Sequence, residues 1–230
     1  GLASGVTRYL RAAAPGTDFR FVEPAGGASL TAAVAGGGPV TLPRINSFVD
    51  GAAVARLGQA NYAALGWVRP DQILLAPEDR ICGTMLEMLN VEGIVLEPAG
   101  ALAVDALPDL AAVVRGRTVV CVTSGGNFDF ERLPEVKERA QRFAGLKKYV
   151  ILRMPQRPGA LREFLSMLGP DDDIARFEYL KKSARNFGSV LIGIETTEAA
   201  NFARLFARMD EAAFSYRDIT GDDALAEFLI

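Results

Sequence analysis

The sequence predicts an α/β domain followed by a smaller α+β domain, and three observations carry this prediction. Strand-like apolar runs alternate with helical patterns in the first part of the chain, which is typical of a mostly parallel sheet covered by helices on both faces. Near residue 145 the order changes to strand, helix, two strands, helix and strand. With 230 residues, 50% of them hydrophobic, the chain can bury a core in each domain. We expect domains over residues 1–144 and 145–230.

The elements of the first domain follow from the periodicity of its apolar residues. An opening helix has one apolar face that is expected to be buried, made of Leu2, Val6, Tyr9 and Leu10. Because domains seldom begin with such a helix, we expect further sequence before residue 1. Strands are predicted over 19–22 and 72–76, at the start of 94–107 and over 116–127. Helices are predicted over 27–36, 59–67, 77–93 and the end of 94–107, with a loop over 42–58.

The second domain has a βαββαβ order. Strands are predicted over 146–155, 174–183, 188–196 and 214–220, and helices over 159–169 and 198–213. Alternating apolar residues, such as Val150, Leu152 and Met154, indicate strands with one buried face. This order is the split βαβ plan of ferredoxin-like domains.

Composition excludes several classes of function. A net charge of −3 and a pI near 5.2 provide no positive surface for nucleic acid or an anionic membrane. No apolar run is long enough to span a membrane. The two cysteines, Cys82 and Cys121, lie in apolar segments and indicate buried thiols in a reducing compartment, so we expect a cytoplasmic protein. Histidine is absent, which excludes Ser-His-Asp and Cys-His nucleophiles and the commonest zinc sites.

Residues 119–127, VVCVTSGGN, end an apolar run with a hydroxyl, two glycines and an amide. Such a tip is either an ordinary turn at a strand end or the edge of a cofactor site. Other segments contain glycine next to a turn or a helix start, namely GLASGV, VEPAGGASL, FVDGAAVARLG and EPAGAL. The second domain opens with LRMPQRPGALREFLSMLG.

In this order, these segments resemble the threonine dehydratase (threonine ammonia-lyase) family over essentially the whole chain. Members are fold-type-II pyridoxal-phosphate enzymes with, in the short form, a single C-terminal ACT-like regulatory domain. The resemblance implies conversion of L-threonine to 2-oxobutanoate and ammonia in isoleucine biosynthesis. It also implies feedback inhibition by isoleucine, opposed by valine, and a tetrameric parent enzyme.

By this resemblance, Ser124 is a neutral hydroxyl that meets the ring nitrogen of pyridoxal phosphate, and Gly125 lets the backbone pass close to the ring. Gly1 corresponds to the last glycine of the phosphate cradle, and Gly51 to a glycine beside the ring. Glu97 either faces the cofactor or only favours the start of the helix that follows it.

Two further sites are implied by the resemblance. Glu23 corresponds to a glutamate that binds a structural cation in related dehydratases and racemases, although Ser29 replaces the acidic partner. The alternative is that Glu23 only stabilises a helix N-terminus. The amino-acid effector is expected at residues of the ACT-like domain, namely Pro155, Gly159, Ala160, Leu161, Phe177 and Tyr179.

The Schiff-base lysine of the family is missing. It belongs to a Ser-x-Lys-x-Arg-Gly-Ala segment, whereas the first lysine here is Lys137, beyond the Ser124 motif. We therefore expect the chain to be a C-terminal part that is inactive alone and has no catalytic residue of its own. Two alternatives stay open: a free-standing amino-acid sensor without catalysis, and a related enzyme acting on another hydroxy-amino acid.

Overall fold

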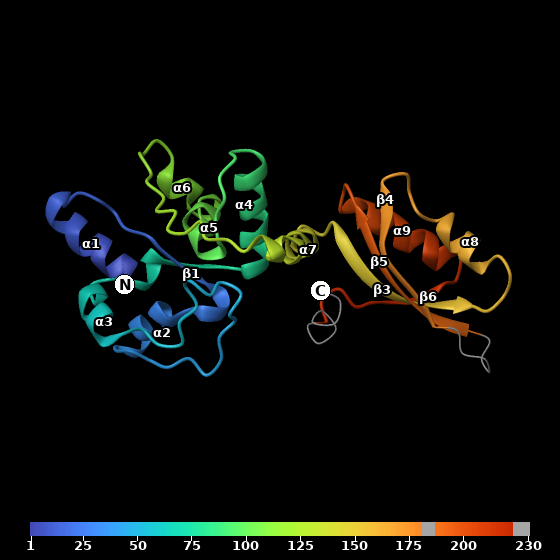
Figure 1. Ribbon diagram of the computed structural model, residues 1–230, viewed down its shortest axis with the longest axis horizontal. Coiled ribbons are helices and arrows are strands. Elements are labelled where there is room, and N and C mark those ends of the chain that lie inside the picture. Colours follow the sequence, from blue (N-terminus) through green and yellow to red (C-terminus); the bar gives the residue numbers. More distant parts are fainter. Residues whose placement is uncertain (181–186, 223–230) are drawn as a thin grey trace. The chain divides into compact units, whose positions relative to one another are not determined.

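A computed structural model describes residues 1–180 and 187–222 of the chain (Figure 1). The last part of the predicted strand 174–183, including Lys181 and Lys182, lies outside the described residues. The chain forms two compact units, Gly1–Val136 and Lys137–Ile230. Within the described ranges, no helix is both long and apolar enough to cross a membrane.

The first unit contains a parallel pair of strands, β1 (Phe21–Pro24) and β2 (Ile73–Ala76). Phe21 lies opposite Ile73 and Pro24 opposite Ala76. In Figure 1, α2 and α3 lie on one side of the pair and α4 and α5 on the other. The prediction of a parallel arrangement with helices on both faces is confirmed.

Two helices of this part begin next to a proline, and two others are followed by glycine. Pro77 is the N-cap of α4, whose first turn carries Glu78 and Asp79, and Pro98 is the first residue of α5. Gly37, with φ of 67°, ends α2 in the left-handed conformation. The α-helices of this part are α1 (Leu2–Ala13), α2 (Ser29–Gly36), α3 (Gln59–Leu65), α4 (Glu78–Asn90), α5 (Pro98–Asp105), α6 (Ala111–Val114) and α7 (Leu133–Phe143). The 3₁₀ turns are η1 (Ala25–Gly27), η2 (Pro70–Gln72), η3 (Pro108–Leu110) and η4 (Phe130–Arg132).

A small apolar core holds β1 to α2 and α3. Phe21, Leu30, Leu65 and Val68 are buried there, and Trp67 packs edge-on against Phe21 at a centroid distance of 5.9 Å. Each large apolar side chain removed from water contributes about 1.5–3 kcal/mol. This core fixes the position of β1 and therefore of the turn that follows it.

Two predicted strands, over 116–127 and at the start of 94–107, are absent from the described structure, and these predictions were wrong. Both segments are irregular, and Val120 is 83% exposed. A strand requires a neighbouring strand for its backbone hydrogen bonds. Within the described residues, a single backbone hydrogen bond is recorded between the two segments, from the Glu97 N–H to the Gly125 carbonyl oxygen at 3.0 Å. Without a neighbouring strand, apolar side chains of this segment such as Val120 stay exposed.

The helix α1 forms as predicted, but the opposite face is buried. Leu2 and Tyr9 are 55% and 72% exposed, whereas Ser4 and Thr7 are buried. Ser4 Oγ donates a 3.3 Å hydrogen bond to Asn61 Oδ1 of α3. Small residues on this face let α1 approach α3 closely, which hydrophobic periodicity alone does not reveal.

The second unit is a four-stranded antiparallel sheet of order β4-β5-β3-β6, the ferredoxin-like arrangement that the βαββαβ order predicts. Figure 1 shows its two helices lying together on one face of the sheet. Its elements are β3 (Lys147–Pro155), α8 (Ala160–Leu165), β4 (Asp172–Leu180), β5 (Phe187–Thr196), α9 (Ala200–Glu211) and β6 (Ser215–Asp218).

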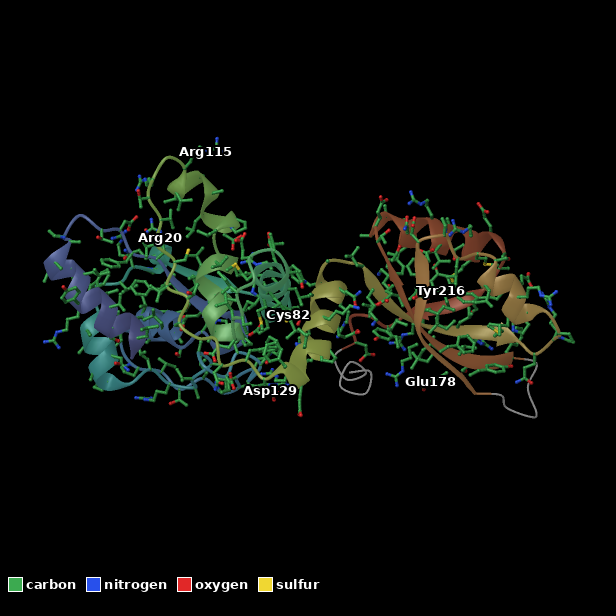
Figure 2. The ribbon with its side chains drawn as sticks, turned by 45° about the horizontal axis from the view of Figure 1, so that its top comes forward. Arg20, Cys82, Arg115, Asp129, Glu178 and Tyr216 are labelled. Atoms are coloured by element: carbon green, nitrogen blue, oxygen red, sulfur yellow. The ribbon has the colours of Figure 1, made fainter. Side chains whose placement is uncertain are left out.

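The core of this unit lies between the sheet and the two helices. Val150 and Leu152 of β3 lie opposite Ile192 and Val190 of β5, and all four are fully buried. Helices α8 and α9 contribute Phe164, Phe202, Leu205 and Met209. Tyr216 of β6, labelled in Figure 2, stacks on Phe206 at a centroid distance of 5.0 Å. The alternating residues predicted for β3, Val150, Leu152 and Met154, are therefore the ones that the structure buries.

Candidate functional site

Three segments far apart in the sequence meet around Glu97. Glu97 is the N-cap of α5, and its N–H donates to the carbonyl oxygen of Gly125 in the Ser124 motif. Gly51, in the loop before α3, faces the same carboxylate. The structure therefore brings together three of the predicted cofactor residues, Gly51, Glu97 and Gly125, from positions that sequence alone leaves unconnected.

The glycines of this cluster have no room for a side chain. A Cβ on Gly125 would lie 2.0 Å from Glu97 Oε1, and a Cβ on Gly51 would lie 3.2 Å from the same atom. A Cβ on Gly100 would lie 2.2 Å from the Gly125 carbonyl oxygen. Gly100 was not predicted as a site residue, although a glycine inside a short helix is a signal of close backbone approach.

Ser124 and Gly1 are both exposed. Among the described residues, none hydrogen-bonds to the Ser124 hydroxyl, so this group is free to donate to a ligand. Gly1 is the N-cap of α1, and a Cβ there would meet no atom within 4 Å. The free hydroxyl next to a side-chain-free backbone fits a flat heteroaromatic ring with one hydrogen-bond acceptor. The assignments of Ser124 and Gly1 stay predictions.

The carboxylate of Glu23 caps α2. Oε1 accepts a hydrogen bond from the Leu30 N–H at 2.6 Å, and Oε2 accepts from the Thr31 N–H and hydroxyl, both at 2.9 Å. This is the favourable position of an acid at a helix N-terminus. Within the described residues, no group of three His, Cys, Asp or Glu side chains is placed to hold a metal ion. A cation at Glu23 stays a prediction, and it would share oxygens that α2 already uses.

A second carboxylate in this unit escaped the sequence reasoning. Glu78 Oε1 accepts a 2.7 Å hydrogen bond from the Gly26 N–H, and a Cβ on Gly26 would lie 2.5 Å from the Cβ of Asn46. Gly26 belongs to the turn after β1, so Glu78 holds that turn to the start of α4. The signal in the sequence is the glycine pair of VEPAGGASL, which by itself predicts only a helix start.

Arg80 locks α4 to α5, the helix that carries Glu97. It contacts Asp105 Oδ2 at 2.8–2.9 Å and Asp109 Oδ2 at 2.7 Å, and the Asp105 side chain is completely buried. Thr84 Oγ1 donates to the other Asp105 oxygen at 2.9 Å. The hydrogen bond to Asp109 and the pairing with Asp105 raise the pKa of Arg80 above its ordinary value. This network holds the C-terminal end of α5 against α4, at the opposite end of the helix from Glu97.

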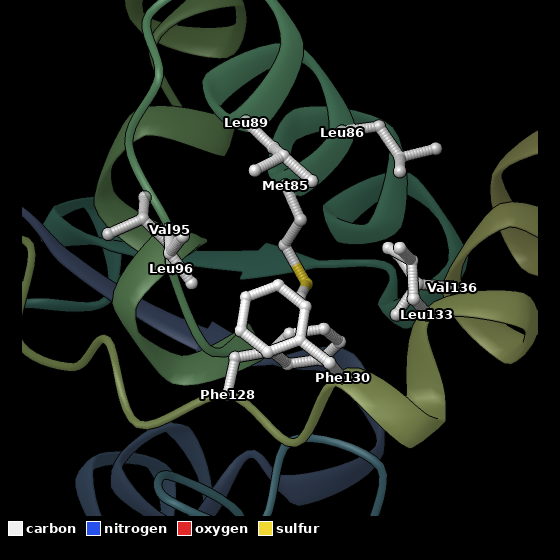
Figure 3. Close-up of a pocket in the computed structure, with 9 residues that line it drawn as sticks. All are labelled: Met85, Leu86, Leu89, Val95, Leu96, Phe128, Phe130, Leu133 and Val136. Atoms are coloured by element: carbon white, nitrogen blue, oxygen red, sulfur yellow. The ribbon is translucent and has the colours of Figure 1, made fainter.

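A narrow pocket beside the Glu97 cluster is apolar throughout (Figure 3). Phe128 and Phe130 meet edge-on there at a centroid distance of 5.6 Å. Its lining residues are Met85, Leu86, Leu89, Val95, Leu96, Phe128, Phe130, Leu133 and Val136. Without a polar side chain it cannot orient an amino acid, so we interpret it as a packing junction.

The predicted effector residues lie at one end of the second sheet. Pro155 ends β3 opposite Phe187 of β5, while Tyr179 of β4 packs over Gly188, where a Cβ would lie 2.6 Å from the ring. Gly159 precedes α8 with φ of 87°. Phe177, Tyr179 and Leu161 are 38%, 41% and 41% exposed, whereas Ala160 is buried. The backbone and the side chain of Ala160 are therefore both shielded, and the effector site stays a prediction.

Comparison with protein families divides the chain as the two units do. A family of pyridoxal-phosphate-dependent enzymes matches residues 1–125, and the C-terminal regulatory domain of threonine dehydratase matches residues 138–229. Both resemblances noted in the sequence are confirmed.

Among curated relatives, biosynthetic L-threonine dehydratase IlvA of Bacillus subtilis is 47% identical over 231 residues, covering 100% of this chain and 54% of the relative. The enzyme of the same name from Corynebacterium glutamicum is 43% identical and covers 100% and 53%. The chain thus spans about half the length of the curated relatives it matches.

Solved structures show the same likeness. The processed form of threonine deaminase isoform 2 from Solanum lycopersicum aligns with a TM-score of 0.55 and 30% identity, over 60% of this chain and 40% of that chain. Maize serine racemase aligns with a TM-score of 0.50 and 25% identity, over 59% of this chain and 44% of that chain.

Proposed function

Because the chain belongs to the family of pyridoxal-phosphate-dependent enzymes, we propose that it is the C-terminal part of a threonine ammonia-lyase. The observation that carries this proposal is the meeting of Gly51, Glu97 and Gly125, since the family match extends across all three segments. The reaction would convert L-threonine to 2-oxobutanoate and ammonia. Serine, or another hydroxy-amino acid, remains the alternative substrate.

Three residues, Ser124, Gly51 and Gly125, would face the cofactor ring, and Glu97 and Gly1 would complete this side of the site. Pyridoxal phosphate, when bound, supplies an electron sink for the bond broken at the substrate α-carbon. The Ser124 hydroxyl would donate a hydrogen bond to the ring nitrogen and, because it is neutral, would not require that nitrogen to be protonated. Gly51 and Gly125 present backbone instead of side chains, and Glu97 holds their spacing. Gly1 would stand at the phosphate.

The chain does not carry every group that the reaction needs. All five of its lysines lie at or beyond position 137, and none has the family's context. We propose that the lysine, the remainder of the phosphate cradle and the groups that grip the substrate carboxylate come from sequence outside residues 1–230. The 230-residue chain alone is then inactive, and the cytoplasm and a tetrameric parent stay predictions.

The second unit would provide regulation. Its match to the regulatory domain of threonine dehydratase supports an amino-acid effector. Isoleucine as inhibitor and valine as its antagonist are what the family resemblance implies. The exposed rings of Phe177 and Tyr179 and the side chain of Leu161 offer an apolar surface for a branched side chain.

Paired hydroxyl variants test the cofactor assignment. In the protein expressed from the complete gene that encodes this chain, Ser124→Ala is expected to weaken pyridoxal-phosphate binding about 10-fold, since a hydrogen bond to the ring is lost. Thr123→Val removes the neighbouring exposed hydroxyl and is expected to leave binding unchanged. Equal effects of the two variants on cofactor fluorescence titrations would refute the role of Ser124.

The match over residues 138–229 also favours a second candidate, an amino-acid sensor without catalysis. Calorimetric titration of the 230-residue chain with isoleucine and valine tests binding, while 2-oxobutanoate formation by the complete gene product tests catalysis. Binding without catalysis by a cofactor-loaded protein supports the sensor. Catalysis with threonine supports the lyase.

A further inference from the structure

Arg132 joins the start of α7 to the loop that carries Gly51. Its Nη2 donates a 3.4 Å hydrogen bond to the carbonyl oxygen of Phe48, and its guanidinium lies 5.0 Å from the centroid of the Phe48 ring. On its other side, Nε lies 3.2 Å from Glu135 Oε2 in the first turn of α7. Because Phe48 is only 4% exposed, the guanidinium is held against a fixed partner.

The position of Phe48 sets the position of Gly51, three residues later. Val49 is fully buried, and its carbonyl oxygen accepts a 2.8 Å hydrogen bond from the Ala53 N–H, which closes a compact turn. At Gly51 the distance from an ideal Cβ position to Glu97 Oε1 is 3.2 Å, so there is little slack. A displacement of Phe48 therefore changes the spacing between Gly51 and Glu97.

Helix α7 reaches the other flank of the same cluster through apolar contacts. Leu133 and Val136 line the apolar pocket together with Leu96, the residue before Glu97. Figure 3 shows Met85 and the two phenylalanine rings between Leu96 and this pair. Val136 is fully buried. The first turn of α7 thus lines the same pocket as Leu96, the neighbour of Glu97, and Arg132, just before this turn, contacts the loop that carries Gly51.

The remaining turns of α7 belong to the second compact unit and are bound firmly within it. The boundary between the units, at residues 136 and 137, falls inside the helix. Glu138 and Lys147, both nearly buried, form an ion pair at 2.6 Å. Arg142 Nη2 donates to the Thr220 carbonyl oxygen at 2.7 Å. The second half of α7 is therefore tied to the sheet of its own unit by an ion pair and a hydrogen bond.

We propose that Arg132 is the positioning residue through which α7 controls the Gly51 loop, so that an effector bound in the second unit alters the cofactor edge through it. The effector step rests on the proposed function. Allosteric coupling requires an element whose state both sites bias. Helix α7 is the candidate for that element, because its residues 133–136 belong to the first unit and its residues 137–143 to the second. A planar guanidinium can bind a carbonyl, a carboxylate and a ring face together, which a lysine ammonium cannot.

Hydrogen exchange on the 230-residue chain tests the positioning role, independently of any activity. In Arg132→Met, the peptide covering residues 46–54 is expected to exchange about 10-fold faster than in the wild type, because the loop opens more easily. Arg132→Lys should resemble Arg132→Met. The matched control is Arg115→Met, at an exposed loop shown in Figure 2, which should leave this peptide unchanged. Unchanged exchange in Arg132→Met would overturn the proposal.

Inhibition of the complete enzyme tests the coupling. Arg132→Met is expected to raise the isoleucine concentration for half inhibition about 10-fold, while isoleucine binding to the 230-residue chain stays within about 2-fold of the wild type. Wild-type inhibition in this variant would overturn the coupling step. If isoleucine does not bind the wild-type chain, the effector part of the proposed function and the coupling step both fail, whereas the exchange experiment still decides whether Arg132 holds the loop.

Discussion

The carboxylate of Glu97 occupies the space that any side chain at Gly125 would need, with Oε1 only 2.0 Å from an ideal Cβ position there. The contact is between the flexible end of one side chain and the backbone of a distant segment. A substitution at Gly125 can therefore displace the Glu97 carboxylate while the fold of the unit is kept.

Gly125→Ala is expected to displace the Glu97 carboxylate without unfolding the unit. Because a flexible side chain can rotate away, the free energy of unfolding should change by less than about 1 kcal/mol. Cofactor affinity of the complete enzyme should fall about 10-fold or more, since Glu97 no longer holds Gly51 and the Ser124 motif apart. Urea unfolding and cofactor titration measure the two effects, and wild-type affinity would contradict the prediction.

Gly100→Ala is expected to destabilise the first unit by about 1–3 kcal/mol, because its Cβ would meet the Gly125 carbonyl oxygen at 2.2 Å and backbone cannot move away cheaply. Gly83→Ala is the matched control, a helical glycine in α4 with no atom within 4 Å of its Cβ position. It should stabilise the chain by about 0.5–1 kcal/mol through helix propensity. Changes of opposite sign in the free energy of unfolding, measured with urea, would confirm the role of packing at Gly100. Changes of the same sign would contradict it.

Asp105→Ala is expected to lower the free energy of unfolding by about 3 kcal/mol, because it leaves Arg80 and Thr84 without their buried partner. Asp71→Ala removes the partner of Arg69 in a pair whose side chains are both 63% exposed, and it should cause no measurable change. Thermal unfolding of both variants provides the comparison. A loss at Asp71 as large as that at Asp105 would show that burial does not decide the strength of these pairs.

The raised pKa of Tyr149 predicts that the second unit loses stability at alkaline pH. Burial, together with the hydrogen bond to Glu138, raises the pKa of Tyr149 above its ordinary value of about 10. A raised pKa in the folded state means that the stabilisation is fully present below about pH 10 and is lost as pH rises through the folded pKa. The difference in unfolding free energy between wild type and Tyr149→Phe should therefore be constant at neutral pH and change above about pH 10. Urea unfolding of both proteins from neutral to alkaline pH measures this difference in free energy. A difference that does not change with pH would contradict the prediction.

The sequence reasoning succeeded best in the second unit. The βαββαβ order, the alternation in β3 and the stripe containing Leu205 and Met209 all lie in the structure where the periodicity predicts them. These signals are local, because the spacing of apolar residues within one strand or helix reveals its buried face before its packing partner is known. In the first unit the same patterns predicted strands at 116–127 and near residue 94 that do not form, since within the described residues no strand pairs with either segment.

Part of the candidate site was also accessible to sequence. The motif at Ser124, the glycine in Asp50-Gly51 and the Glu-Pro turn at Glu97 were all recognised, whereas Gly100 and Glu78 were not. Their roles depend on which backbone atoms lie nearby, and those atoms belong to segments some tens of residues away.

Residue identity and short-range spacing were enough to establish the order of elements in the second unit, the absence of histidine chemistry and the family resemblance. Three-dimensional packing was needed to show that Gly51, Glu97 and Gly125 meet and that Glu23 caps α2. It was needed equally for the burial of Ser4 and Thr7 in α1 and for the contact of Arg132 with Phe48. The space around a Cβ and the partner of a carboxylate are set by segments distant in the chain, and local periodicity carries no information about them.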